Sequence, residues 1–337
     1  MNTTFILSGG AGRVICAIPA LEKFAINNPD NDFKIIVHGW DFLFWGNPIL
    51  QHRTFGMGHK GMFDQLIKDN KIVSPEPYHL WSYYNQKKSL VECFDEEINN
   101  TNDHSDLLPP RLFTKKSERN FITGVFTKAR LEKSKNKVIV FQPYGSTMNI
   151  VGGRSVDPSN RSLDPDHALY IAQELSKHAV VVYFGDEPFI HPQDNVMLNL
   201  HPMKPDLRMF MTAIQMSDYF IGCDSVGQHI ARSFNKPGTI VMGSTFEKNV
   251  SYPEHFKFFR NDVEPVYNPI RIGGIDCDLS DILNEGVMDF TKDELDTLIK
   301  QITNEIAPPR SVKTSQVSRP INKFVKVSSD KKDESIC

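Results

Sequence analysis

The chain has 337 residues, more than a single hydrophobic core typically holds, so its length predicts two domains. Hydrophobic residues make up 40% and charged residues 23%, which is the composition of a globular protein rather than a disordered one. The net charge of −3 excludes a basic field over the whole chain, although a local basic patch can still bind phosphates.

Three features bear on the compartment. No apolar run is long enough to cross a bilayer, and the N-terminus lacks the basic segment of a signal peptide. The cysteines are scattered and none has zinc-ligand spacing: Cys16, Cys93, Cys223, Cys277 and Cys337. We therefore expect a cytoplasmic protein with reduced thiols and no integral membrane association.

The first part of the chain reads as an α/β unit. An apolar run over residues 4–8 leads into SGGAGR, apolar residues then recur at helical spacing from Val14 to Ala25, and a second strand-like run, KIIVHGW, follows. This order is the first unit of a parallel sheet. Over residues 41–115 we expect short helices, a strand near Lys71–Val73 and cleft-lining loops, with residues 96–111 as an exposed loop.

The second part repeats the alternation more regularly. A helical stretch over residues 119–137 precedes KVIVFQPYG, a strand that we expect to stop at Pro143. Asp164 before Pro165 predicts a helix N-cap, and Thr291 with Glu294 predicts a capping box on a terminal helix.

The sequence thus predicts an α/β protein with two Rossmann-like domains that face a cleft. The first spans residues 1–135 and the second residues 136–290. A terminal helix over residues 291–306 and a disordered tail over residues 307–337 follow, because the tail is rich in Pro, Ser and Lys and lacks periodicity.

One turn of the second domain has the features of an anion site. A buried strand ends at Gly222, and Asp224, Ser225 and Gly227 then open a helix. Ligands of parallel α/β sheets bind beyond the carboxyl ends of the strands, where a helix N-terminus offers free N–H groups to a diphosphate. We expect Ser225 to add a hydroxyl donor, Gly227 to permit close approach of the ligand, and His229 to face back toward the loop. The alternative is a plain strand–helix junction that Asp224 caps.

The whole segment resembles glycosyltransferase family 9, the lipopolysaccharide heptosyltransferases. That family has a strand, then D-[ST]-G-x-x-H, A-x-x-x-x-x-P, a second strand and G-x-T; the matching residues here are Asp224, Ser225, His229, Ala231, Pro237, Gly243 and Thr245. Val226 stands where the family has glycine, with Gly227 next. The resemblance implies a GT-B fold and a nucleotide-diphosphate sugar bound by this turn, with Thr245 close by.

Two further segments extend the resemblance. FQPYGST is similar to the family's H-P-G-[AS], which implies donor binding by Gly145 and Ser146. Arg161 then takes the place of a family Lys or Arg that offsets charge on the leaving diphosphate. Arg154 competes for that role, and either arginine can instead be a solvated loop charge.

The N-terminal loop is the third segment, similar to S-x-x-G-D-x-x-x-x-x-P-A-L. Its glycines, Gly9, Gly10 and Gly12, permit a tight turn at a helix N-terminus beside the donor. Arg13, however, replaces the Asp that is the family's proposed catalytic base, and arginine cannot accept a proton. Arg13 then either binds an anionic donor or acceptor while another residue is the base, or accompanies a retaining mechanism assisted by the leaving phosphate, or marks an inactive binding protein.

A replacement base should lie at the carboxyl end of a strand in the first domain. His38 and Asp41 follow the KIIV strand directly, and His59 lies in the glycine-rich loop beyond. Asp41 is the first choice, because a partly desolvated carboxylate can act as a base near neutral pH. The alternative is that Asp41 caps the next helix.

We therefore expect a glycosyltransferase that is metal-independent, needs no cofactor and inverts the anomeric centre. Its candidate catalytic residues are Arg13, Asp41 and His229. Its partners are a nucleotide-sugar donor and a saccharide, lipid-linked sugar or modified-base acceptor. The alternatives are an inactive nucleotide-sugar-binding protein and a glycosyltransferase that acts on modified DNA bases, which the lysines of the tail permit. Asp276 and Asp278 have the spacing of a metal-binding pair, but we expect them in a loop.

Overall fold

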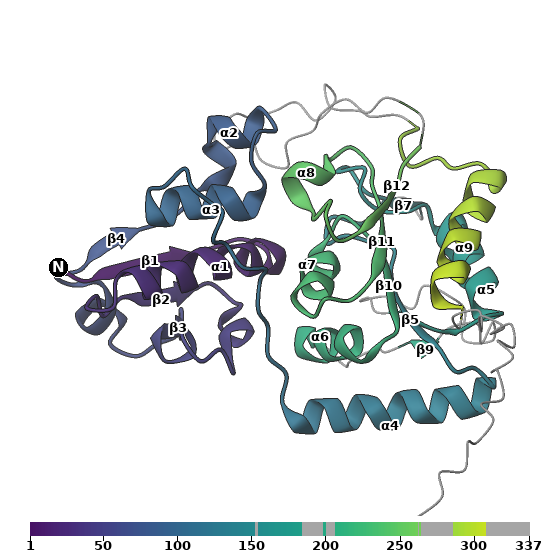
Figure 1. The fold of residues 1–337 in the computed structure, drawn as a ribbon, viewed down its shortest axis with the longest axis horizontal. Coiled ribbons are helices and arrows are strands. Elements are labelled where there is room, and N and C mark those ends of the chain that lie inside the picture. The colour runs from purple at the N-terminus through teal and green to yellow at the C-terminus, as the bar shows by residue number, and fades with distance from the viewer. Residues whose placement is uncertain (152–153, 184–197, 200–205, 262, 264–285, 308–337) are drawn as a thin grey trace, which may run out of the picture. The chain divides into compact units, whose positions relative to one another are not determined.

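The computed structural model describes residues 1–151, 154–183, 198–199, 206–261, 263 and 286–307 (Figure 1). The elements of its N-terminal half are β1 (Thr3–Leu7), α1 (Ala11–Asn27), β2 (Lys34–Val37), η1 (Asp41–Phe44), η2 (Gln51–Arg53), β3 (Thr54–Gly56), η3 (Phe63–Ile67), β4 (Lys71–Val73), η4 (Pro77–His79), α2 (Trp81–Tyr84), α3 (Leu90–Asn99) and α4 (Lys116–Lys133). Those of its C-terminal half are β5 (Val138–Gln142), β6 (Asn149–Val151), β7 (Arg154–Val156), α5 (Pro165–Ser176), β8 (Val180–Tyr183), β9 (Leu198–Asn199), α6 (Leu207–Met216), β10 (Tyr219–Cys223), α7 (Val226–Ser233), β11 (Gly238–Val241), α8 (Glu247–Val250), β12 (Lys257–Phe259) and α9 (Lys292–Ile306).

The N-terminal half contains a four-stranded sheet in the order β3-β2-β1-β4, in which every pair is parallel. Helix α1 crosses from β1 to β2 and packs against α3. Because a parallel crossover brings the next strand back in the same direction, the carboxyl ends of all four strands meet at one edge. The loop before α1 and the turn η1 both begin at that edge.

The C-terminal half contains a six-stranded parallel sheet in the order β12-β11-β10-β5-β8-β9. Helices α6 and α7 cover one face of this sheet and α5 and α9 the other (Figure 1). The period-2 pattern of β5 explains why both faces are buried: Val138 and Val140 enter one core cluster, whereas Ile139 and Phe141 enter the other.

The first of these clusters also contains the core of the N-terminal half, because α1 packs directly on α7. Residues 1–306 consequently form one compact unit. The predicted fold class, two Rossmann-like α/β sheets, is confirmed. The predicted boundary between residues 135 and 136 falls between α4 and β5.

Several local predictions are confirmed by specific hydrogen bonds. The side chain of Asp164 accepts from the backbone N–H of Asp166 at 2.8 Å, with Pro165 opening α5. Thr291 and Glu294 form the predicted reciprocal capping box before α9. The short strand over Lys71–Val73 is also present as β4.

The exposed loop predicted over residues 96–111 is wrong at its start, because α3 continues to Asn99. The capping box of α3 begins at Ser89. The helix has many polar residues in its sequence, but one of its faces is buried. Asp95 is fully buried there and pairs with Lys23 of α1 at 3.0 Å, so a charged residue contributes to helix packing. An interaction across 72 residues of sequence leaves no local pattern.

Among the residues that the structure describes, no helix is long and apolar enough to span a membrane. The predicted tail beyond Ala307 lies outside the described residues, as do the glycine pair 152–153 and the Asp276–Asp278 pair.

Candidate functional site

The predicted turn joins β10 to α7, and a residue from another strand caps it. Ser225 precedes α7 without making a capping hydrogen bond of its own. Gln142, at the end of β5, accepts from the Gly227 N–H at 3.0 Å and donates to Ser225 Oγ at 3.2 Å. One of the unpaired N–H groups at this helix end is therefore satisfied from within the protein. Ser225 and Val226 remain partly exposed beside it.

Gly227 is explained by packing rather than by ligand approach. It is buried, and a Cβ atom there would lie 2.2 Å from Gln142 Oε1 and 2.6 Å from Phe220 Cζ. The glycine is thus required for Gln142 to reach the helix end, which replaces the reason expected from the sequence.

Gly227→Ala should therefore lower the free energy of unfolding by about 1–3 kcal/mol, the usual cost of overpacking a core. Gln142 must leave the helix end and the buried Phe220 ring must shift. Denaturant unfolding monitored by circular dichroism measures this loss. Gly10→Ala is the matched control, because no described residue other than its two chain neighbours has an atom within 4 Å of its Cβ position. Equal stabilities for the two variants would refute the packing account.

Asp224 lies behind the turn and faces the protein. It is 2% exposed, and its carboxylate accepts from Thr245 Oγ1 at 2.8 Å and from Gln228 Nε2 at 2.5 Å. Burial raises the pKa of Asp224, while the charge of Arg161 and these two hydrogen bonds oppose the rise. Asp224 and Thr245 thus come together as predicted, but as a buried contact that joins β10, α7 and the loop after β11.

Arg161 lies over this turn with its guanidinium held by neutral acceptors. Nε donates to Ser159 Oγ at 2.9 Å, and the two terminal nitrogens donate to Thr147 Oγ1 and to the Asp224 carbonyl, each at 3.3 Å. One of them lies 3.8 Å from the Cβ position of Gly145. No carboxylate of the described residues lies within ion-pair distance of Arg161, so its charge is available to an anion.

A half-buried carboxylate keeps this arrangement rigid. Asp157 accepts hydrogen bonds from Thr147 at 2.7 Å, from the backbone N–H of Ser159 at 2.9 Å and from that of Ser162 at 3.0 Å. Burial would raise the pKa of Asp157, but its hydroxyl and backbone donors outweigh burial and lower it. The loop that carries Arg161 is therefore preorganised. Ser146 is exposed at its edge, and the side chain of Arg154 lies outside the described residues.

The glycine loop before α1 approaches the same turn from the N-terminal half. Gly9 has φ +94°, a conformation that favours glycine, and Gly10 opens α1 without a side-chain cap. Gly12 fits against α7, since a Cβ there would lie 2.9 Å from His229 Cδ2 and 3.6 Å from the Val226 Cα. Two helix N-termini thus lie side by side, one from each half.

His229 lies in this contact between the halves. Its Nδ1 is 3.0 Å from Tyr252 Oη and 3.4 Å from Cys16 Sγ of α1. Burial lowers the pKa of His229 to about 4, so the ring is neutral at pH 7. Burial likewise raises the pKa of the Cys16 thiol to about 12, which makes it a poor nucleophile.

His229 should make stability depend on pH. The unfolded chain binds a proton at His229 below its ordinary pKa of 6.5, whereas the folded chain binds one only near pH 4. Its contribution is therefore present above pH 6.5 and is lost as the pH falls toward 4, by up to about 3 kcal/mol. In His229→Gln this pH-dependent contribution should vanish. The test measures the unfolding free energy of the wild type and of His229→Gln as a function of pH and takes the difference. Parallel curves for the two proteins would contradict the prediction.

Arg13 points away from the turn into the N-terminal half. Its guanidinium donates to the Pro75 carbonyl at 2.7 Å and to Glu76 Oε2 at 3.0 Å, over the rings of Tyr78 and Phe94. The side chain is 5% exposed. This placement gives Arg13 a structural ion pair and favours a base located elsewhere.

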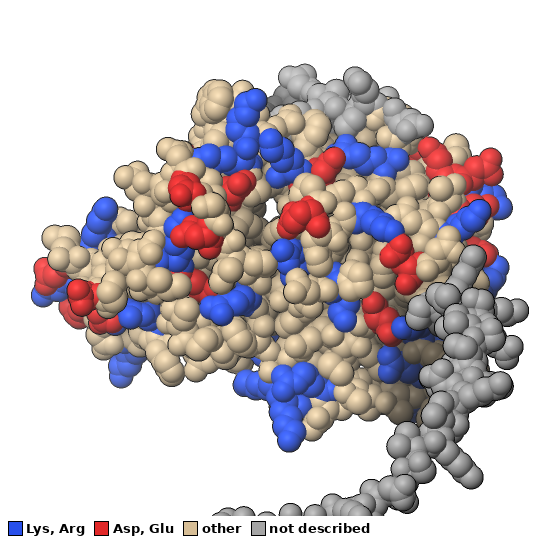
Figure 2. All heavy atoms as spheres, viewed as in Figure 1, with Lys and Arg blue, Asp and Glu red and all other residues tan. Residues whose placement is uncertain are grey.

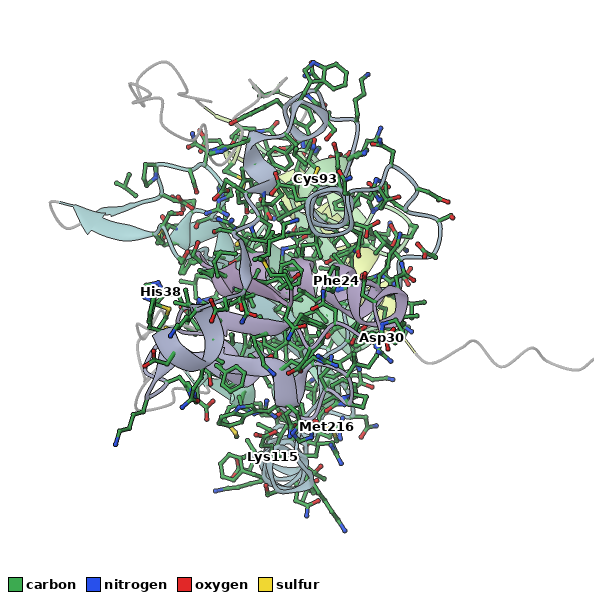
Figure 3. The ribbon with its side chains drawn as sticks, turned by 90° about the vertical axis from the view of Figure 1, so that its left-hand side faces the viewer. Phe24, Asp30, His38, Cys93, Lys115 and Met216 are labelled. Carbon is green, nitrogen blue, oxygen red and sulfur yellow. The ribbon has the colours of Figure 1, made fainter. Side chains whose placement is uncertain are left out.

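Asp41 lies at the carboxyl edge of the N-terminal sheet, in a cavity of about 500 Å³. Figure 3 views this sheet, with His38 and Asp30 on opposite sides at the two ends of β2; Asp41 follows at the His38 end. The N-cap of η1 is Trp40 and makes no side-chain cap, and no described residue hydrogen-bonds to the Asp41 carboxylate. The cavity is lined by Asp41, Trp45, Gly46, Gln51, His52, Thr54, Phe113, Thr114, Lys115 and Arg208.

Basic side chains contribute to the same cavity. Lys115 lies 4.6 Å over the ring of Trp45, at the start of α4 (Figure 3), where Lys and Arg side chains gather on an otherwise mixed surface (Figure 2). Of the other candidate bases, His38 is exposed, whereas His59 bonds Gln65 at 3.0 Å. Arg208 and Lys115 have no sequence motif that would have marked them.

No protein-family model matches the sequence, and no curated protein is significantly similar to it. Solved structures match its fold. A family 9 glycosyl transferase from Veillonella parvula has a TM-score of 0.66 at 11% identity and covers 90% of this chain and 97% of its own. The E. coli ADP-heptose lipopolysaccharide heptosyltransferase II has a TM-score of 0.59 at 14% identity and covers 90% and 99%. An iron-containing dodecameric glycosyltransferase from enterotoxigenic E. coli has a TM-score of 0.59 at 11% sequence identity, and the match covers 90% of this chain and 76% of that one. The chain therefore has the GT-B fold of these glycosyltransferase structures, as its motifs implied.

Proposed function

We propose that the chain is a glycosyltransferase that moves a sugar from a nucleotide-diphosphate sugar to an acceptor hydroxyl. The observation that carries this proposal is the arrangement around Arg161. A preorganised cation that has no carboxylate partner among the described residues lies at the N-terminus of α7, beside the N-terminus of α1, which no side chain caps. A diphosphate is the ligand that such a combination of charge and helix ends favours.

The reaction uses groups at the carboxyl edges of both sheets. The acceptor hydroxyl attacks the anomeric carbon in line, the bond from that carbon to the diphosphate oxygen breaks, and the leaving diphosphate takes up the electron pair. Arg161 and the α7 N-terminus offset the charge that grows on it. Asp41, from the cavity of the N-terminal half, takes the proton of the hydroxyl. The transfer inverts the anomeric centre and requires no metal, because Arg161 supplies the cation.

His229, Asp224 and Thr245 have a supporting role in this mechanism. A neutral, buried His229 joins α7 to α1, and Asp224 braces the turn that carries Ser225. Their contribution is to hold the two helix ends in one geometry rather than to exchange protons with the substrate.

The direct test incubates the purified chain with nucleotide-diphosphate sugars and follows release of the nucleoside diphosphate. ADP-heptose is the first donor to try, since the E. coli neighbour is named for it. Slow donor hydrolysis that speeds up with a saccharide acceptor, persists in EDTA and is lost in Arg161→Ala is the expected result. Loss of activity in EDTA would overturn the metal-independent mechanism, and the absence of both binding and release across the panel would overturn the proposal.

The position of Arg13 supports one second candidate, a nucleotide-sugar-binding protein without turnover. The residue aligned with the family's proposed base is an arginine turned toward Glu76. Tight donor binding without release of nucleotide, across a broad acceptor panel, would favour this candidate.

A further inference from the structure

Arg208 is a buried arginine that joins four segments of the chain. It lies in the first turn of α6, and its side chain is 8% exposed. Nε and Nη2 donate to the two oxygens of Glu118 at 2.6 and 2.8 Å, the bidentate geometry in which arginine binds carboxylates most strongly. Nη1 donates to the Phe42 carbonyl at 3.0 Å, and Nη2 also donates to the Phe113 carbonyl at 2.9 Å.

These contacts connect the donor-binding half to the turn that carries Asp41. Phe42 follows Asp41 in η1 of the N-terminal half, whereas α6 belongs to the C-terminal sheet. Phe113 lies in the segment that links the two halves, and Glu118 lies in the first turn of α4. A single guanidinium therefore fixes η1, the linker and α4 relative to α6.

The far end of α6 holds the linker as well. Thr114 Oγ1 donates to Gln215 Oε1 at 2.5 Å, and Arg119 donates back to the Thr114 side chain at 3.0 Å. The linker is thus fastened at both ends of one helix. Unlike Gln215 and Arg119, Arg208 also contacts η1, and it lines the same cavity as Asp41.

We infer that Arg208 is a positioning residue, which sets the place of Asp41 relative to the donor through the Phe42 carbonyl. This inference rests on the proposed function. Misplacement of a catalytic group by about 1 Å can cost roughly a hundredfold in rate. Donor binding should not depend on Arg208, because Arg161 and the α7 turn are held by Asp157 and Asp224 instead.

The test compares Arg208→Met, Arg208→Lys and Glu118→Gln with the wild type. Arg130→Met is the control, since Arg130 of α4 pairs with Asp218, next to β10, at 3.2 Å and does not contact η1. For each variant, kcat is measured with donor and acceptor, and Kd for ADP by titration calorimetry. Activity is expressed per molecule that binds ADP, so that an unfolded fraction does not count.

We expect kcat of Arg208→Met to fall about 10- to 100-fold while Kd for ADP stays within about twofold. Arg208→Lys keeps the positive charge but not the planar fork, so it should recover part of the rate. The kcat of Glu118→Gln should lie between those of the wild type and Arg208→Met. Arg130→Met should match the wild type. An Arg208→Met protein with wild-type kcat per binding site, or with kcat lowered and Kd for ADP raised together, would overturn the positioning role.

The proposed function fails in a different way from this inference. If the wild type releases no nucleotide from any donor, the proposed function and the inference resting on it both fall. If the wild type turns over and Arg161→Ala does not, but Arg208→Met keeps its rate, only the role of Arg208 is refuted.

Discussion

Replacing Arg161 with alanine is expected to lower kcat by about 10²- to 10³-fold and to weaken ADP binding at least about tenfold. The guanidinium lies over the Asp224 carbonyl at the α7 turn and has no carboxylate partner among the described residues, so nothing else in the turn supplies its charge. Arg161→Lys keeps the charge but loses the planar fork, and should fall between the wild type and alanine.

Steady-state kinetics and calorimetry with ADP measure both effects. Arg53→Ala is the matched control, because Arg53 bonds to Asp32 and to nearby carbonyls of the N-terminal half. Binding of ADP to the wild type should weaken as salt is raised, and this dependence should shrink in Arg161→Ala. An unchanged affinity in Arg161→Ala would show that the diphosphate lies elsewhere.

Replacing Asp41 with asparagine is expected to lower kcat by about 10²- to 10⁴-fold while leaving Kd for ADP unchanged. Asparagine keeps the shape of the side chain and its place in the cavity, but it cannot take the proton of the acceptor hydroxyl. Asp64→Asn is the control, because Asp64 is an exposed residue of η3.

Product stereochemistry, read by NMR from the anomeric signal, accompanies this measurement. Inversion with a strong Asp41 effect is the expected pair of results. Retention with wild-type kcat in Asp41→Asn would contradict the role of Asp41 and would favour assistance by the leaving phosphate.

Local patterns were enough to predict much of the fold. The aromatic and aliphatic run before Gly222 and the small polar residues after it specify a strand that turns directly into a helix, because each feature acts within a few residues. The same holds for the cap at Asp164 and for the capping box at Thr291. Repetition of such units with both faces apolar predicted two parallel sheets.

The interactions that shape the site are not local, and so the sequence did not indicate them. Gln142 caps α7 from 85 residues away, and this cap, not ligand approach, explains Gly227. Arg208 reaches Phe42 across 166 residues, and the direction of Arg13 depends on Glu76. Residue type alone predicted a positive charge at Arg13 and Arg208, but not whether that charge faces a ligand or the protein.

The central claim is that the diphosphate of the donor binds at the α7 turn, and a crystal structure of the chain with ADP tests it most directly. We expect phosphate oxygens within hydrogen-bonding distance of Arg161 and of Ser225 or Val226, with Asp41 facing the open side of the β-phosphate. Phosphates bound instead in the second cavity, of about 430 Å³ and lined by residues that include His104, Arg232 and Lys248, would contradict the account.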